Sequence, residues 1–100
     1  MFRRFQVQGD SMAPTLRSGQ RVLTSLWPYR CLKPGMIVLA RHPLYGLLIK
    51  RLEQVEPERF RLCSDNATPE TLGTRDWLPR TALVGRVLVA TPLGRSRRNS

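Results

Sequence analysis

Residues that commonly bind metals or form disulfides are scarce in this chain. It has 100 residues but only one histidine, His42, and two cysteines, Cys31 and Cys63, which are not spaced as zinc ligands. We therefore expect neither a metal nor another cofactor. With so few cysteines and enough apolar residues for a small core, we expect two thiols rather than a disulfide framework.

Long apolar runs are also absent. The longest, residues 36–40, has five members, whereas a membrane-spanning helix needs about 18. Charged and polar side chains interrupt residues 1–8, so the start of the chain does not resemble the apolar segment of a signal peptide. The sequence therefore predicts no membrane span, and we expect a cytoplasmic location.

Acidic residues are few, and the chain is strongly basic. Seven Asp and Glu accompany 17 Lys and Arg, which gives a net charge of +10. Five arginines lie near the two ends of the chain: Arg3, Arg4, Arg95, Arg97 and Arg98. Basic ends usually keep a small domain soluble and allow weak attraction to anionic lipid, and we expect no specific nucleic-acid partner. The alternative is a nucleic-acid-binding β domain, with Trp27, Tyr29 and Tyr45 as stacking groups.

The fold class follows from the short segments between glycines and prolines, of which there are seven and eight. Alternating or apolar segments predict β-strands at residues 5–8, 21–26, 37–41, 47–55, 59–63 and 83–90. The pair Pro34-Gly35 predicts a type II turn, and residues 64–79 are expected to form a polar loop. We predict one all-β, mainly antiparallel domain over residues 1–90 and a basic, disordered tail over residues 91–100.

Residues 9–16 (GDSMAPTL) contain the first candidate for a catalytic group, Ser11. Gly9 and Pro14 favour a tight turn in which the serine hydroxyl and nearby backbone N–H groups are accessible. A nucleophilic serine needs this geometry, because the same N–H groups can bind the oxyanion. The alternative is a structural turn or helix cap, with Pro14 in the first turn of a short helix.

Lys50 is the second candidate. The chain uses arginine at most basic positions and has only two lysines, Lys33 and Lys50. Lys50 lies in the most apolar predicted strand, and Leu48 and Leu52 share its face. Desolvation there disfavours the ammonium, so Lys50 can act as a general base near neutral pH, which arginine cannot. The alternative is a lysine at the strand edge whose amino group reaches water.

A serine and a lysine on different strands of one small sheet can form a catalytic pair. Lys50 follows Ser11 by 39 residues, and the sequence around Ser11 matches neither Ser-x-x-Lys nor Gly-x-Ser-x-Gly. A Ser-His-Asp triad remains an alternative, and it would need His42. Its acid would be one of three aspartates, Asp10, Asp65 or Asp76.

Three segments, in order, resemble the signature boxes of the Ser–Lys peptidases, a group that includes signal peptidase I and the LexA-type self-cleaving repressors. Residues 9–16 are similar to their serine box, and residues 49–52 (IKRL) to their lysine box. The segments SDN (64–66), TLGTR (71–75) and LVGRV (83–87) resemble the later signal-peptidase box. The resemblance implies a small β fold of this type, with a short helical turn after the nucleophile.

The resemblance also implies roles for particular residues. Lys50 matches the general base, Thr71 matches a hydroxyl that orients this lysine, and Asp65, Asn66 and Arg75 support the site. The match is imperfect in the last box, where Ser64 replaces the usual Gly, Gly73 stands where an Asp is expected, and one residue is inserted.

The neighbours of Ser11 suggest how the oxyanion and the substrate are bound. Gly9 lies two residues before Ser11, so no hydroxyl at that position can assist the oxyanion. The backbone N–H of Ser11 would have to bind it, and we expect the backbone at Gly9 and Ser11, together with Met12, to bind the oxyanion and the substrate. Met12 is expected to form part of the wall of the peptide-binding site.

The short form of the chain, with no N-terminal anchor, most resembles the nickel-type superoxide dismutase maturation proteases, which are implied to remove an N-terminal propeptide. We expect a serine endopeptidase whose partner is a protein substrate, the nickel superoxide dismutase precursor. One alternative is an anchorless signal peptidase acting on secretory precursors. Another is a self-cleaving switch, which is disfavoured because only eight residues precede the serine box.

Overall fold

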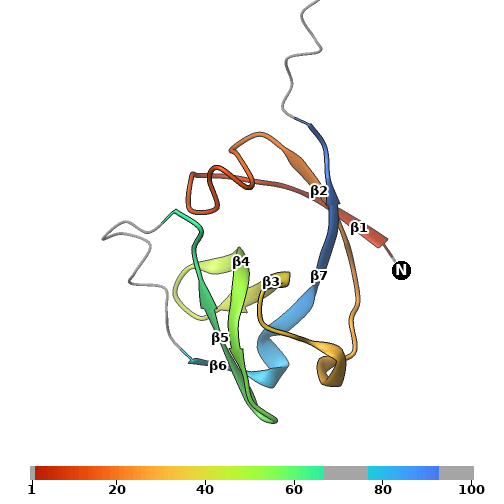
Figure 1. Cartoon of the computed structure of the whole chain (residues 1–100), viewed down its shortest axis with the longest axis vertical. Coiled ribbons are helices and arrows are strands. Elements are labelled where there is room, and N and C mark those ends of the chain that lie inside the picture. The colour runs from red at the N-terminus through yellow and green to blue at the C-terminus, as the bar shows by residue number, and fades with distance from the viewer. Residues whose placement is uncertain (1, 67–76, 93–100) are drawn as a thin grey trace, which may run out of the picture.

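The chain forms one antiparallel sheet in the computed structural model, which describes residues 2–66 and 77–92 (Figure 1). The strands are β1 (Phe2–Gln6), β2 (Arg21–Ser25), β3 (Ile37–His42), β4 (Gly46–Val55), β5 (Arg59–Cys63), β6 (Trp77–Pro79) and β7 (Leu83–Ala90). Within these residues the sheet order is β1-β2-β7-β3-β4-β5-β6. The predicted all-β, antiparallel class is confirmed.

Most strand boundaries agree with the sequence-based prediction. The ends of β2, β3, β4, β5 and β7 lie within one residue of the predicted ranges. β1 begins earlier than predicted, because Phe2 already pairs with Ser25 of β2. β6 lies in the range predicted as a loop, and its three residues are too few to show a two-residue period.

Short turns and 3-10 segments connect the strands. Gly35 has a φ of 100°, and the Met36 N–H donates to the Lys33 carbonyl at 3.2 Å, which confirms the type II turn before β3. Among the described residues, the 3-10 segments are η1 (Tyr29–Cys31) and η2 (Arg80–Ala82). In the described part of the chain, no helix has the length and apolar composition needed to cross a membrane.

Irregularities in the strand pairing allow the sheet to curl. The register shifts at Leu23/Thr24 in β2, at Leu39/Ala40 in β3 and between Leu52 and Gln54 in β4. Shifts of this kind bend a strand and increase its twist. In Figure 1 the sheet bends around, so that β1 and β2 lie above β3, β4 and β5, with β7 running between the two groups.

Gly85 allows β7 to pass close to β2. A Cβ atom at this position would lie 2.6 Å from the Ser25 carbonyl oxygen, a distance that real contacts do not reach. Gly85 belongs to the last of the three boxes, and the structure gives it a packing role.

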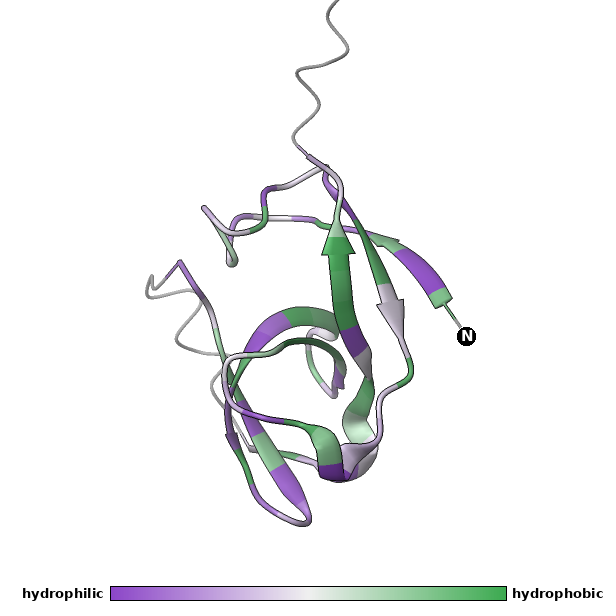
Figure 2. Ribbon diagram, turned by 45° about the vertical axis from the view of Figure 1, so that its right-hand side comes forward, coloured by the Kyte–Doolittle hydropathy of each residue, from purple (hydrophilic) through white to green (hydrophobic). Residues whose placement is uncertain are grey.

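In the described part of the chain, two groups of buried side chains form the core. The larger consists of Leu32, Val38, Ala40, Leu52, Phe60, Leu62 and Leu78, and the smaller of Val7, Met12, Leu16 and Val22. β7 contributes to both, since Leu83 packs against the first group and Val87 against the second. Its apolar residues are visible along the strand in Figure 2. The smaller group lies next to the candidate nucleophile, because Met12 directly follows Ser11.

The end of β7 is hydrogen bonded to β2 slightly beyond the predicted domain boundary. The Thr91 N–H donates to the Arg21 carbonyl at 2.8 Å, and the Arg21 N–H donates to the Thr91 hydroxyl at 3.0 Å. Thr91 falls within the predicted tail, of which residues 93–100 lie outside the described part of the chain.

Candidate active site

Ser11 lies in a hydrogen-bonded loop that joins β1 to β2. The base of this loop is closed by Val7, whose N–H donates to Gln20 at 2.7 Å and whose carbonyl accepts from Gly19 at 2.9 Å. Its tip contains one helical turn, in which the Leu16 N–H donates to the Met12 carbonyl at 2.8 Å. Because Met12 is buried, with 2% of its surface exposed, the loop next to Ser11 is anchored to the core.

Lys50 lies near the centre of β4 and is buried, with 3% of its surface exposed. Its neighbour on the same face, Leu52, is also buried. The Lys50 Nζ donates to the Ser64 hydroxyl at 2.7 Å. Burial lowers the pKa of Lys50, and this effect exceeds the opposing influence of the Cys63 thiol. The neutral amine of Lys50 is therefore more favoured than that of a lysine side chain in water.

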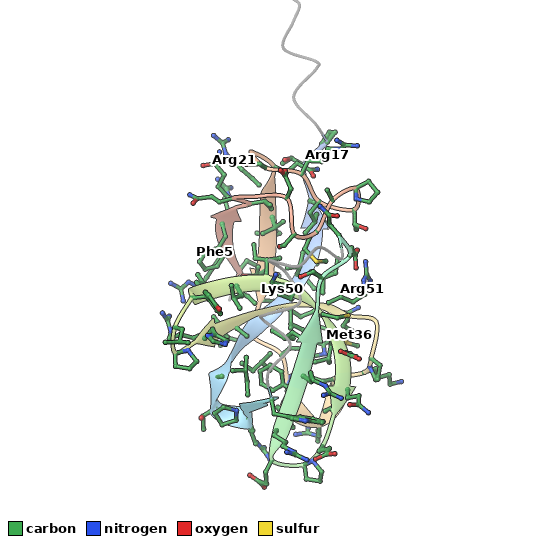
Figure 3. The ribbon with its side chains drawn as sticks, turned by 90° about the vertical axis from the view of Figure 1, so that its left-hand side faces the viewer. Phe5, Arg17, Arg21, Met36, Lys50 and Arg51 are labelled. Carbon is green, nitrogen blue, oxygen red and sulfur yellow. The ribbon has the colours of Figure 1, made fainter. Side chains whose placement is uncertain are left out.

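A cavity of about 420 Å³ contains both candidates. It is lined by residues 5–8 at the end of β1, by residues 47–50 of β4, and by Ser11, Met12 and Leu39. In Figure 3, Lys50 is seen between Phe5, on the β1 side, and Arg51. β1 and β4 are not neighbours in the sheet, so the curl of the sheet creates this cavity.

Asp65 connects the Ser11 loop to the strand that carries Lys50. Arg51, next to Lys50, donates to both Asp65 carboxylate oxygens at 2.8 and 2.7 Å. The Thr15 hydroxyl, from the Ser11 loop, donates to the same carboxylate at 2.5 Å. The bonds from Arg51, followed by the bond from Thr15, lower the pKa of Asp65 against the effect of its burial. Asp65 is therefore an ionised link between the two catalytic candidates.

Asn66 fixes the backbone on both sides of the Ser11 N–H group. Its N–H donates to the Ser11 carbonyl and its side-chain amide to the Asp10 carbonyl, both at 2.9 Å. In a trans peptide the C=O and N–H groups point in opposite directions, so the Ser11 N–H points away from Asn66. Within residues 2–66 and 77–92 the Ser11 N–H makes no hydrogen bond. It is therefore available to bind an oxyanion.

With this geometry in place, comparison with known proteins identifies the family. A family model described as Peptidase S24-like matches residues 4–88. The chain belongs to the S24-like peptidases. Membership supports a serine-peptidase type of function with a protein substrate, and it confirms the resemblance to the LexA and signal peptidase group. No curated protein and no solved structure matches the chain.

In this S24-like peptidase, most of the residues selected from the sequence lie together. Ser11, Met12 and Lys50 line one cavity, and Asp65 and Asn66 bind the segments that carry them. Gly9, two residues before Ser11, is exposed and has a φ of 81°. The two other predicted supporting residues, Thr71 and Arg75, lie outside the described part of the chain.

Sequence reasoning missed two contacts of this S24-like site. The sequence identifies Ser64 only as a replacement for the usual Gly, yet its hydroxyl accepts the hydrogen bond from Lys50. The sequence places Arg51 in the lysine box and predicts no partner for it. The available signal was the SDN segment itself, since three polar residues directly after a predicted strand can bind three groups across the site.

The structure does not favour the His42 triad. His42 is buried at the end of β3 and does not line the cavity. Its Nδ1 accepts hydrogen bonds from the N–H groups of Leu44 and Tyr45 at 3.0 and 3.3 Å. His42 therefore stabilises the turn between β3 and β4 in this peptidase.

The aromatic side chains of the nucleic-acid alternative already have partners. Arg86 lies over the Trp27 ring at 4.6 Å, and Arg80 lies over the Tyr29 ring at 4.8 Å. Tyr45 packs against His42, with ring centroids 4.6 Å apart. Arginine and histidine occupy ring faces on which bases would have to stack.

Proposed function

We propose that this chain is a Ser–Lys endopeptidase in which Ser11 is the nucleophile and Lys50 is the general base. The observation that carries the proposal is the buried amine of Lys50 in the cavity that Ser11 also lines. A lysine whose pKa is lowered by burial has a lone pair available at a pH where an exposed lysine is charged. The proposed reaction takes place in the cytoplasm and requires no cofactor.

In the proposed reaction, the Lys50 amine takes the proton of the Ser11 hydroxyl as its oxygen attacks the carbonyl carbon of the peptide. The Ser11 N–H stabilises the negative oxygen of the tetrahedral intermediate. The intermediate then expels the amine of the leaving peptide, which receives its proton from the Lys50 ammonium. Water, deprotonated by Lys50, hydrolyses the acyl-enzyme and restores both side chains.

The proposed substrate is the precursor of nickel superoxide dismutase, cleaved after its N-terminal propeptide. Support for this substrate comes from the resemblance of the chain to the nickel-type superoxide dismutase maturation proteases. The cavity suits an extended peptide, because apolar side chains such as Phe5, Leu39 and Leu47 line it beside Ser11 and Lys50.

A cleavage assay tests the nucleophile and the base together. The unprocessed dismutase precursor is incubated with wild type, Ser11→Ala and Lys50→Ala, and its products are identified by mass spectrometry. We expect both substitutions to reduce cleavage by about 10⁴-fold or more, since groups that act as one unit cannot be removed singly without loss of the whole effect. Cleavage that survives Lys50→Ala would rule out the mechanism.

Matched variants separate chemistry from folding. Lys33→Ala removes the other lysine, which is exposed, and should leave cleavage within twofold of wild type. His42→Asn keeps an acceptor for the Leu44 and Tyr45 N–H groups while removing the imidazole, and it should also stay active. Loss of cleavage in folded His42→Asn would favour the triad instead.

The same assay separates the substrate from the chemistry. If wild type leaves the dismutase precursor intact but processes a secretory precursor, and this cleavage is lost in both Ser11→Ala and Lys50→Ala, the substrate assignment is wrong and the dyad stands. If the wild-type chain itself becomes shorter during the incubation while the Ser11→Ala chain keeps its length, the protein cleaves itself.

A further inference from the structure

The hydroxyl in contact with the Lys50 amine comes from Ser64, at 2.7 Å. The family resemblance places a lysine-orienting hydroxyl later in the chain, at Thr71, and a Gly at the position of Ser64. The contact therefore involves a residue to which the resemblance assigns no role.

A lysine base needs a fixed direction for its lone pair. Its amino group ends a flexible four-carbon side chain and can rotate about the last bond. When one N–H of the neutral amine donates to Ser64, that rotation is restricted. The lone pair can then be held toward the cavity that Ser11 also lines.

The Ser64 hydroxyl is a well-anchored acceptor. Cys63, directly before it, is paired with Arg51 in the β4–β5 ladder, and Asp65, directly after it, is bound through two hydrogen bonds by the same Arg51. Arg51 is in turn the next residue after Lys50. Arg51 therefore binds the residues on both sides of Ser64, and these contacts hold the Ser64 hydroxyl next to the Lys50 amine.

We propose that Ser64 is the positioning residue for Lys50, holding the amine in the orientation required to deprotonate Ser11. This inference rests on the proposed Ser–Lys function and adds a residue to it. Ser64 itself does not touch the substrate. Its effect is exerted through Lys50.

Kinetics of Ser64→Ala compared with Ser64→Thr test the role on the dismutase precursor. Misplaced catalytic groups lose about 10²-fold in rate, so we expect kcat of Ser64→Ala to fall by about that factor, with KM within twofold of wild type. Ser64→Thr keeps the hydroxyl and should recover at least a tenth of the wild-type kcat. The matched control is Ser25→Ala, because among the described residues the Ser25 hydroxyl donates only to the adjacent Leu26 carbonyl.

The pH profile distinguishes positioning from a general loss of stability. A hydroxyl acceptor stabilises the ammonium more than the neutral amine, because hydrogen bonds from charged donors are stronger. Ser64→Ala should therefore shift the acidic limb of kcat/KM to lower pH, although its plateau is lower than that of wild type. If Ser64→Ala is slower than wild type although more of its Lys50 is neutral, the loss of rate lies in the orientation of the amine and not in its protonation. An unshifted limb or a kcat within twofold of wild type would overturn the proposal.

A measurement independent of cleavage keeps the two proposals separate. The chain has only two lysines, so NMR of protein with ¹³C-labelled lysine side chains gives one signal for Lys50 and one for exposed Lys33. We expect the Lys50 signal of wild type to titrate below the ordinary range of a lysine side chain, and the Lys50 signal of Ser64→Ala to titrate at a lower pH still. If Ser64→Ala leaves the Lys50 midpoint in place while Thr71→Ala moves it, Ser64 is not the positioning residue.

Discussion

Burial of Lys50 favours the neutral amine that the proposed catalysis requires, but it makes the folded chain less stable. Burial of its side chain, with 3% of the surface exposed, favours the neutral amine and lowers its pKa. The unfolded chain binds a proton at Lys50 more readily than the folded chain does. Stability is therefore reduced at neutral pH, and it rises with pH between the lowered pKa and the ordinary value of about 10.4.

Replacing Lys50 by methionine should stabilise the protein while abolishing cleavage. Methionine has a similar volume and no charge to desolvate, so we expect the melting temperature at pH 7 to rise by a few degrees. The gain should shrink as the pH approaches 10, where the lysine of the unfolded chain also becomes neutral. Thermal unfolding followed by circular dichroism from pH 6 to 10 checks both points.

The control for this prediction is Lys33→Met. Lys33 is exposed, so its replacement should change the melting temperature little at any pH in the series. A difference between wild type and Lys50→Met that stays constant from pH 6 to 10 would contradict the linkage.

At the scale of the elements, the segment after β5 links two parts of the sheet that are far apart in its strand order. Asp65 binds Arg51 of β4 and Thr15 of the Ser11 loop, and Asn66 binds the backbone at Asp10 and Ser11. The side chains of Asp65 and Arg51 are 15% and 32% exposed, so water screens their interaction only in part. This segment holds the Ser11 loop next to β4.

Replacing Asp65 by asparagine should weaken this link. The charge-assisted bonds to Arg51 are lost, which we expect to lower the free energy of unfolding by about 2–3 kcal/mol at pH 7. Because the folded-state pKa of Asp65 is lowered, its contribution is fully present above the unfolded value of about 3.9. It is lost as the pH falls through the lower folded value, so the difference from wild type should disappear in acid.

Urea unfolding at pH 7 and at decreasing acidic pH measures this difference, with Glu56→Gln as the control. Arg59 and Glu56 form a pair of the same 2.7 Å length, but their side chains are 51% and 47% exposed. Removing such a pair should cost less than about 1 kcal/mol. Equal losses for the two substitutions would show that the position of Asp65 has no special role.

Positive charge and exposed apolar side chains characterise the molecule as a whole. The net charge is +10, and the β3–β4 turn exposes 80% of Leu44 and 53% of Tyr45. The proposed weak attraction to anionic lipid rests on the charge, because basic side chains near such a surface each add to the attraction. Residues 91–100 contribute three arginines to this charge.

Deletion of residues 93–100 should separate the attraction to lipid from cleavage. It removes three arginines and keeps Thr91, which is hydrogen bonded to β2. We expect cleavage of the precursor to remain within twofold of wild type. Co-sedimentation with vesicles of anionic lipid in low salt should decrease, while vesicles of neutral lipid give little binding in either case. Loss of cleavage would show that the tail belongs to the peptidase domain.

The sequence by itself determined most of the strands (β6 is the exception), the turn at Gly35 and the two residues proposed for catalysis, because these depend on local patterns and on residue type. A rare lysine in an apolar strand and a serine in a Gly-Pro turn are visible in the chain. Only the tertiary structure decided that Ser64 contacts Lys50 and that Arg51 binds Asp65. These contacts depend on strand register and on the curl of the sheet, which bring together side chains 14 residues apart in each pair. The two-residue period of a strand assigns each side chain to a face, but the residues that lie opposite one another also depend on the turns and bulges between the strands.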